Sequence, residues 1–278
     1  MTSITSTPTF SLAYLEAMRS VKYQLVAGTS FLVWDIILTF PGEREYIWRM
    51  RRYLFKWFYF YFRYFLLAVQ IFHLAISPGL SSGQTPDSLC IIWYRYIVFI
   101  AQVSISMIDT ILVIRVYALF NRNRQIGVFL GSLILLESGL AVIHMVKCPA
   151  VEYLEACFLL KPHNDLANAH TIVVMTVQSI LMGMFIFKQV VGVRLGWGRT
   201  PLLSFLVKDA TSNYIAVFLL CSTTLAFLGF DDQRAIAVFY WSTPLYSAVG
   251  CRLILNMERF ARRCLPDEEI MLTSHITL

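Results

Sequence analysis

The chain has 278 residues, of which 58% are hydrophobic and only 14% are charged, and its mean hydropathy is +0.64. Soluble domains usually contain about 25% charged residues, so this composition predicts an integral membrane protein. The net charge is +6, and the basic residues lie in short segments between apolar ones. That placement favours contact with anionic lipid headgroups. No basic stripe is interleaved with aromatic residues, which argues against nucleic-acid binding.

Seven apolar stretches are long enough to form membrane-spanning helices, because about twenty mostly apolar residues cross the hydrocarbon core. We therefore predict an all-α, polytopic seven-helix transmembrane bundle. A polar N-terminal segment at 1–21 precedes the membrane domain at 22–256, and a tail follows at 257–278. The expected spans are, in chain order, roughly 22–40, 54–76, 91–119, 126–146, 170–191, 210–229 and 235–255.

Lysine and arginine residues are unequally distributed over the predicted loops. Positively charged loops resist translocation, so the richer side marks the cytosol. This asymmetry predicts an N-terminus outside and a tail in the cytosol. Residues 1–20 lack the pattern of a cleaved signal peptide, so the first span is expected to insert the chain. The inner set is Arg44, Arg49, Arg51, Arg52, Arg115, Arg122, Arg124, Lys188, Arg194, Arg199, Lys208, Arg252, Arg259, Arg262 and Arg263, and the outer set is Arg19, Lys22, Lys147, Lys161 and Arg234.

A basic motif marks the inner end of the third span. Arg115 and Tyr117 lie near the end of the apolar run, and Arg122 and Arg124 follow it. Together with the basic residues of the first loop and the tail, this motif is expected to form a basic inner face. Such a face is a candidate docking surface for a cytosolic signalling partner.

An intramembrane polar network is predicted from Asp35, Arg63, Asp109 and Glu137. Charged groups at membrane depth usually face the bundle interior and find partners. At a rise of about 1.5 Å per residue, Arg63 and Asp109 are level, which predicts an ion pair with Asp35 as the competing acid. Glu137 has no obvious basic neighbour, so we expect it to carry a proton. The network either only fixes helix packing or acts as a switch, and the sequence leaves both open.

Polar residues near the outer ends of the spans suggest two further arrangements. Gln70 and Gln102 are level with each other, which fits either a hydrogen bond between helices or a small outer ligand site. His73, His144 and His170 would permit the zinc cluster of an intramembrane hydrolase, but no known metal motif accompanies them. We therefore expect no resident metal or cofactor.

The six cysteines form no CxxC pair, which excludes the commonest zinc and redox motifs. Cys90, Cys148 and Cys157 fall on the predicted outer side, where the environment is oxidising. The sequence leaves open a disulfide from Cys90 to Cys157, a disulfide from Cys90 to Cys148, and three free thiols.

Several short motifs are spread over most of the chain. They are Asp35 with Leu38 and Thr39, then Glu43, Ile47 and Trp48, then Lys56, Arg63 and Tyr64, then 115–119, 206–209 and 252–258. Together they resemble a family of fungal, mainly basidiomycete, seven-pass membrane proteins with an N-terminal domain of unknown function. Trp34 stands where that family usually has a tyrosine, and Pro41 and Gly42 replace acidic residues. The resemblance implies a seven-pass architecture and a fungal source, but no activity.

The third span also invites an analogy with G-protein-coupled receptors, because Cys90 lies at its outer end and Arg115 and Tyr117 lie at its inner end. The seventh span lacks the NPxxY order of those receptors, and Ile114 rather than an acid precedes Arg115.

These patterns favour a receptor-like, non-enzymatic protein of the plasma membrane or another secretory-pathway membrane, with the lipid bilayer as a partner. The alternative is a transporter or channel with Arg63, Asp109 and Glu137 on its polar pathway, and the third possibility is the hydrolase. A receptor predicts a closed cytosolic half and a pocket that opens outward. A transporter predicts a continuous wet path, and a hydrolase predicts converging histidines.

Overall fold

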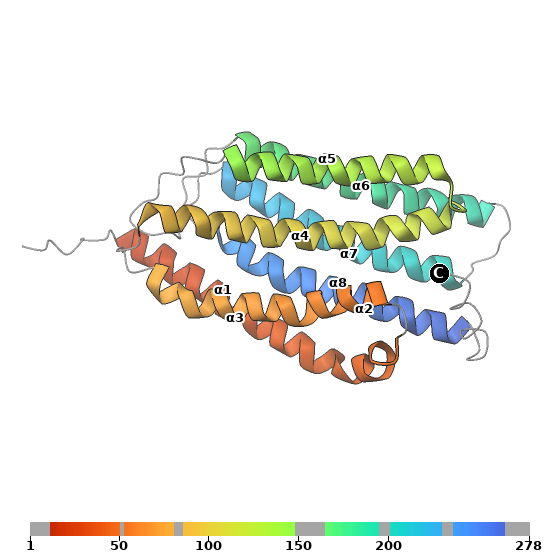
Figure 1. Cartoon of the computed structure of the whole chain (residues 1–278), viewed down its shortest axis with the longest axis horizontal. Helices are drawn as coiled ribbons and strands as arrows, with labels where there is room; N and C mark the ends of the chain where they lie inside the picture. The colour runs from red at the N-terminus through yellow and green to blue at the C-terminus, as the bar shows by residue number, and fades with distance from the viewer. Residues whose placement is uncertain are drawn as a thin grey trace, which may run out of the picture.

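The structure is a computed structural model that describes residues 12–50, 53–80, 86–147, 165–194, 201–229 and 236–264. Over these ranges the chain contains helices and no β-strand. The long helices lie side by side in one elongated bundle (Figure 1). The predicted all-α polytopic bundle is therefore confirmed.

Successive helical rods run in opposite directions along the bundle (Figure 1). Helix α1 spans Leu12–Gly42 and continues into a π-helical turn, η1, at Glu43–Ile47. The second rod is continuous and consists of α2 (Tyr53–Phe60), a π-helical turn η2 (Tyr61–Phe65) and α3 (Leu66–Leu80). The remaining helices are α4 (Asp87–Leu119), α5 (Arg124–Lys147), α6 (Asp165–Arg194), α7 (Pro201–Gly229) and α8 (Ile236–Cys264).

Length and composition identify the helices that can cross a membrane. Within the described ranges, α7 contributes only a shorter apolar stretch at Tyr214–Phe227. The start of α1 and the end of α8 lie at opposite ends of the bundle (Figure 1). The five segments that are long and apolar enough are Met18–Ile47, Tyr53–Pro78, Ser88–Leu119, Arg124–Val146 and Asn168–Lys188.

The outer surface of the bundle is apolar, and several charged side chains are inside. Trp34 is 60% exposed, Leu135 is 75% exposed and Val146 is 68% exposed, whereas Arg63 and Asp109 are fully buried. A soluble protein rarely exposes such large apolar patches. Hydrocarbon around the helices explains why apolar side chains are on the surface and charged side chains are inside, because it solvates apolar side chains and excludes charged ones.

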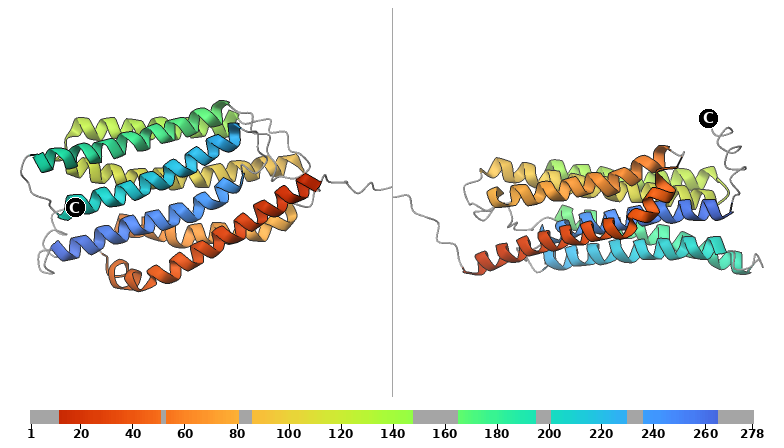
Figure 2. Two further views of the ribbon diagram at one scale, coloured as in Figure 1. Left: turned by 180° about the vertical axis from the view of Figure 1, so that it is seen from behind. Right: turned by 90° about the horizontal axis from the view of Figure 1, so that it is seen from below.

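Helix α8 is the central element of the packing. It packs against α1, α3, α4 and α7, and Figure 2 shows it between α1 and α7. Gly250 is where α8 approaches η2 most closely, since a Cβ atom there would lie 2.6 Å from the ring of Phe62. On the other side of the bundle, α5 packs against α4 and α6.

The first span is longer than predicted. We expected Pro41 and Gly42 to end it, but α1 runs to Gly42 and η1 extends the rod to Ile47. Proline is tolerated where neighbouring helices and local π-helical adjustments accommodate the freed backbone groups. As a result, Glu43 lies inside the bundle and is fully buried.

Candidate functional site

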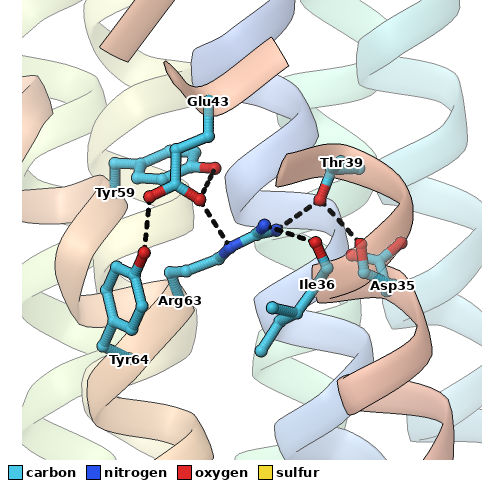
Figure 3. Close-up of polar contacts among 7 residues, drawn as sticks. All are labelled: Asp35, Ile36, Thr39, Glu43, Tyr59, Arg63 and Tyr64. Atoms are coloured by element: carbon cyan, nitrogen blue, oxygen red, sulfur yellow. Dashed lines mark hydrogen bonds and ion pairs between the residues drawn. The ribbon is translucent and has the colours of Figure 1, made fainter. Parts of the chain in front are cut away.

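Glu43 and Arg63 form a buried ion pair between η1 and η2 (Figure 3). Arg63 Nε lies 3.0 Å from Glu43 Oε2, and the two side chains are 0% and 1% exposed for Glu43 and Arg63. Glu43 begins η1 and Arg63 is the middle residue of η2. π-Helical turns are rare and occur frequently at functional sites. The pair therefore joins two unusual backbone segments from different rods.

Two tyrosines donate hydrogen bonds to the carboxylate of Glu43. Tyr59 donates a hydrogen bond to Oε2 at 3.3 Å, and Tyr64 donates one to Oε1 at 2.6 Å. These tyrosines are five positions apart, a spacing that turns side chains about 140° from each other on an ordinary α-helix. The π-helical turn between them brings both hydroxyls to one carboxylate. Burying a charge requires this kind of complete hydrogen bonding.

The guanidinium of Arg63 also connects the second rod to α1. Its NH2 donates to the backbone carbonyl of Ile36 at 2.7 Å, and its NH1 donates to Thr39 Oγ1. Thr39 Oγ1 in turn donates to the backbone carbonyl of Asp35 at 2.7 Å. The guanidinium also lies 5.9 Å from the centre of the Tyr59 ring. Arg63 is thus held from three directions (Figure 3).

Asp35 has a different partner from the one considered above. Its Oδ1 accepts a hydrogen bond from Arg252 NH2 at 2.7 Å, which ties α1 to α8. The Asp35 side chain is 4% exposed, whereas that of Arg252 is 59% exposed. The carboxylate is therefore buried while the arginine reaches out of the bundle.

The predicted ion pair between Arg63 and Asp109 is wrong. Arg63 pairs with Glu43, and Asp109 Oδ1 accepts a hydrogen bond from Gln178 Nε2 on α6. The two predicted partners are level along their helices, but Asp109 faces α5 and α6 rather than η2. Glu137 on α5 is the electrostatic neighbour of Asp109.

The predicted hydrogen bond between Gln70 and Gln102 is also wrong. Gln102 Oε1 lies 3.0 Å from His170 Nε2, and its Nε2 donates to Ser106 Oγ at 3.2 Å. Gln70 Nε2 instead donates to the backbone carbonyl of Tyr240 at 3.2 Å. The two glutamines therefore belong to separate polar groups.

His73, His144 and His170 do not converge on one point. His144 stacks on His170 with ring centres 6.1 Å apart, whereas His73 packs 5.0 Å from Trp93 and 5.5 Å from Tyr240. Among the residues that the structure describes, no group of three or more histidine, cysteine, aspartate or glutamate side chains is placed to hold a metal ion.

The basic motif of the third span is divided between the interior and the surface. Arg115 is buried and its NH2 donates to the backbone carbonyl of Leu253 on α8 at 2.5 Å. Arg122 and Arg124 are exposed in the turn between α4 and α5. Asn121 and Arg122 adopt left-handed φ angles of 56° and 57° there, which makes the turn tight.

Tyr117 is half-buried against the start of α5. A Cβ atom at Gly127 would lie 3.0 Å from its ring, so this glycine permits a close approach. Tyr117 therefore packs between α4 and α5, whereas its predicted neighbours in the basic motif point elsewhere.

The end of α8 holds η1 through contacts that the sequence did not suggest. Arg262 NH2 donates to the backbone carbonyl of Tyr46 at 3.0 Å, and its NH1 donates to that of Glu45 at 3.3 Å. The guanidinium groups of Arg259 and Arg262 lie 5.4 and 5.5 Å from the Tyr46 ring. Arg262 on α8 thus donates hydrogen bonds to two backbone carbonyl groups of η1.

Cys90 near the start of α4 is disulfide-bonded. Both cysteines predicted as its partner, Cys148 and Cys157, lie outside the described residues. Cys221 and Cys251 are free and buried.

Residues 23–68 match a family model described as a family of unknown function, DUF6533. No curated protein and no solved structure matches the chain. The matched segment contains η1, α2, η2 and parts of α1 and α3, and therefore every residue labelled in Figure 3. The predicted N-terminal domain of unknown function is confirmed over these residues. The part of the chain that defines this family is also the part that builds the Glu43–Arg63 pair.

Proposed function

We propose that this integral membrane protein is a receptor-like, non-enzymatic seven-pass protein of the plasma membrane or another secretory-pathway membrane. In this proposal a ligand changes the arrangement of the inner half of the bundle, which alters a basic surface that a cytosolic partner contacts. The N-terminus is outside and the tail is in the cytosol. The observation that carries the proposal is the buried Glu43–Arg63 pair between two π-helical turns.

A buried ion pair favours two discrete arrangements over gradual movement. Separating Glu43 from Arg63 inside the bundle leaves an uncompensated charge, which is strongly unfavourable. The pair therefore stays formed until Arg63 finds another acid. Asp35 is that acid in our proposal, because it lies one turn before Thr39 on α1, and the Thr39 hydroxyl joins Arg63 to the backbone carbonyl of Asp35 (Figure 3). Exchange of Arg63 from Glu43 to Asp35 would release η1.

Contacts from α8 support a closed inner half in the arrangement described above. Arg115 joins α4 to the backbone of α8 at Leu253, and Arg262 joins α8 to η1 at Tyr46. Movement of η1 is thereby coupled to α8, and movement of α8 is coupled to α4. A chain of direct contacts with two discrete arrangements is the physical basis that a switch requires.

The proposed cytosolic surface lies at the same end of the bundle. Arg122 and Arg124 are exposed in the turn between α4 and α5, and this turn lies at the end where α8 finishes (Figure 1). The excess of basic residues at this end supports its cytosolic placement. Opening of η1 away from this turn would change the shape of the surface without changing its charge.

Distance measurements between two spin labels test the switch. One label is placed at Trp48→Cys, which is 58% exposed at the end of η1, and the other at Arg122→Cys. We expect one narrow distance distribution without further change and a second, longer population in Glu43→Gln, because the neutral amide holds Arg63 less strongly. Labelling without the introduced cysteines gives the background.

The control is Glu16→Gln, which removes one acidic charge at the exposed start of α1, away from the Glu43–Arg63 pair. This variant should leave the distances unchanged. An unaltered distribution in a folded Glu43→Gln protein would overturn the proposed switch.

A transporter is the second candidate, and one observation favours it. Asp109 and Glu137 are neighbouring buried acids, and in the described part of the chain neither takes part in an ion pair. Unpaired acids at membrane depth often mark proton or ion pathways. Proton or substrate flux in proteoliposomes that Asp109→Asn abolishes would replace the receptor proposal with this one. Absence of flux in both proteins would favour the receptor.

A further inference from the structure

A second buried polar cluster lies between α4, α5 and α6, away from the Glu43–Arg63 pair. Asp109 on α4 is 0% exposed and Glu137 on α5 is 1% exposed. Within the described residues, Oδ2 of Asp109 and both carboxyl oxygens of Glu137 have no hydrogen bond of normal geometry. The two carboxyl groups interact with each other, and Gln102 is a further polar neighbour of Glu137.

The electrostatics of this pair require a positive partner. Two carboxylates at close range in a medium of low dielectric cannot both remain charged. Among the described residues, Cys221 on α7 and Tyr246 on α8 also interact electrostatically with both acids, and neither supplies a positive charge. Either protons or a bound cation must therefore neutralise the pair.

Polar groups surround the acid pair. Gln178 on α6 donates to Oδ1 of Asp109, which orients the carboxyl group. Ser106 lies one turn from Asp109 on α4, and its hydroxyl is 3.5 Å from that of Ser138, which follows Glu137 on α5. Carboxylate and hydroxyl oxygens are the ligands that hard cations prefer.

A line of polar side chains connects the acid pair with the outer end of the bundle. Ser106 accepts a hydrogen bond from Gln102, Gln102 contacts His170, and His170 stacks on His144. Both ring nitrogens of His144 are buried without a hydrogen-bond partner in the described part of the chain, and the side chain is 4% exposed. This line places polar side chains between the acid pair and the end of the bundle where α5 finishes and α6 begins.

We propose that Asp109 and Glu137 form a binding site for a small monovalent cation of the size of sodium, which competes there with protons. One cation together with one retained proton balances the two carboxyl charges. A calcium ion usually takes about six to eight oxygen ligands, which is more than the free carboxyl oxygens and serine hydroxyls supply. The site does not depend on the proposed Glu43–Arg63 switch, so either can fail without the other.

Thermal unfolding of the purified protein in detergent tests this site. Sodium chloride is compared with choline chloride at equal ionic strength, at about pH 8 and about pH 5.5. We expect sodium to raise the melting temperature by roughly 5 °C at about pH 8 when it exceeds its dissociation constant by about a hundredfold. The rise should be smaller at about pH 5.5, because protons then occupy the carboxyl groups.

The variants Asp109→Asn and Glu137→Gln should fold and lose the sodium-dependent rise, since each removes a charge that the cation balances. Glu258→Gln is the matched control and should keep it. Saturable binding of radioactive sodium should follow the same pattern. A melting temperature that is equal in sodium and choline would overturn the proposal, and so would a full sodium response in Asp109→Asn. Stabilisation by calcium or potassium but not sodium would also contradict it.

Discussion

Gln70 on α3 donates a hydrogen bond to the backbone carbonyl of Tyr240 on α8, four residues before Pro244. Proline has no N–H group, so it cannot donate the helical hydrogen bond that this carbonyl would otherwise accept. Gly28 on α1 leaves room for the contact, because a Cβ atom there would lie 3.0 Å from the same carbonyl oxygen. Three helices thus meet where Gln70 donates the hydrogen bond that Pro244 cannot donate.

This relationship predicts that Gln70→Leu destabilises the protein by about 1 kcal/mol, the usual size of a polar contact between membrane helices. Pro244→Ala restores the missing N–H donor, so Gln70→Leu should cost less in that background. Reversible unfolding of the single and double variants measures the difference. An equal cost in both backgrounds would show that Pro244 does not create the need for Gln70.

Gly250 provides a test of the contact between α8 and η2. In Gly250→Ala the new methyl group would lie 2.6 Å from the ring of Phe62, which is fully buried and cannot move away freely. We expect a loss of about 1 to 3 kcal/mol in stability, as for other overpacked cores. Gly131→Ala on α5 is the control, because no atom lies within 4 Å of its added carbon. Equal stability of the two variants would contradict the packing described here.

The proposed orientation predicts which introduced cysteines an impermeant thiol reagent reaches in intact cells. Ser88 at the start of α4 and Arg122 after its end are both exposed. Ser88→Cys should react in intact cells, whereas Arg122→Cys should react only after the membrane is permeabilised. The opposite pattern would reverse the bundle, and reaction of both in intact cells would show that α4 does not span the membrane.

The first five helical rods could be predicted because hydrocarbon imposes a length and an apolar composition on each of them. The predicted fourth span, 126–146, differs from α5 by only a few residues at the ends. The main error in the fold was at Pro41 and Gly42, where local propensity predicted an end and tertiary contacts carry the helix onward. Contacts from Arg259 and Arg262 on α8 reach η1, and a sequence without long-range information does not reveal them.

The candidate site could be predicted only in part. Depth along a helix follows from residue spacing, so Arg63 and Asp109 were rightly placed inside the bundle. The direction in which each side chain points depends on the rotation of its helix about the helix axis. The π-helical turns change that rotation, and no sequence pattern predicts where they occur. Glu43 was missed as a partner because the first span was ended before it. Its presence with Arg63 in the same family motif was the one available signal.

The most direct test of the account is a double-mutant cycle on Arg63. Arg63→Leu alone should lower stability by about 3 to 5 kcal/mol, because it leaves the carboxylate of Glu43 buried and unpaired. Adding Glu43→Leu should recover part of this loss, whereas adding Asp109→Leu should recover none, since these residues share no contact. Unfolding free energies of the unchanged protein, the three single variants and the two double variants give the coupling energy of each pair. Recovery with Asp109→Leu and not with Glu43→Leu would contradict the buried pair on which the proposed switch depends.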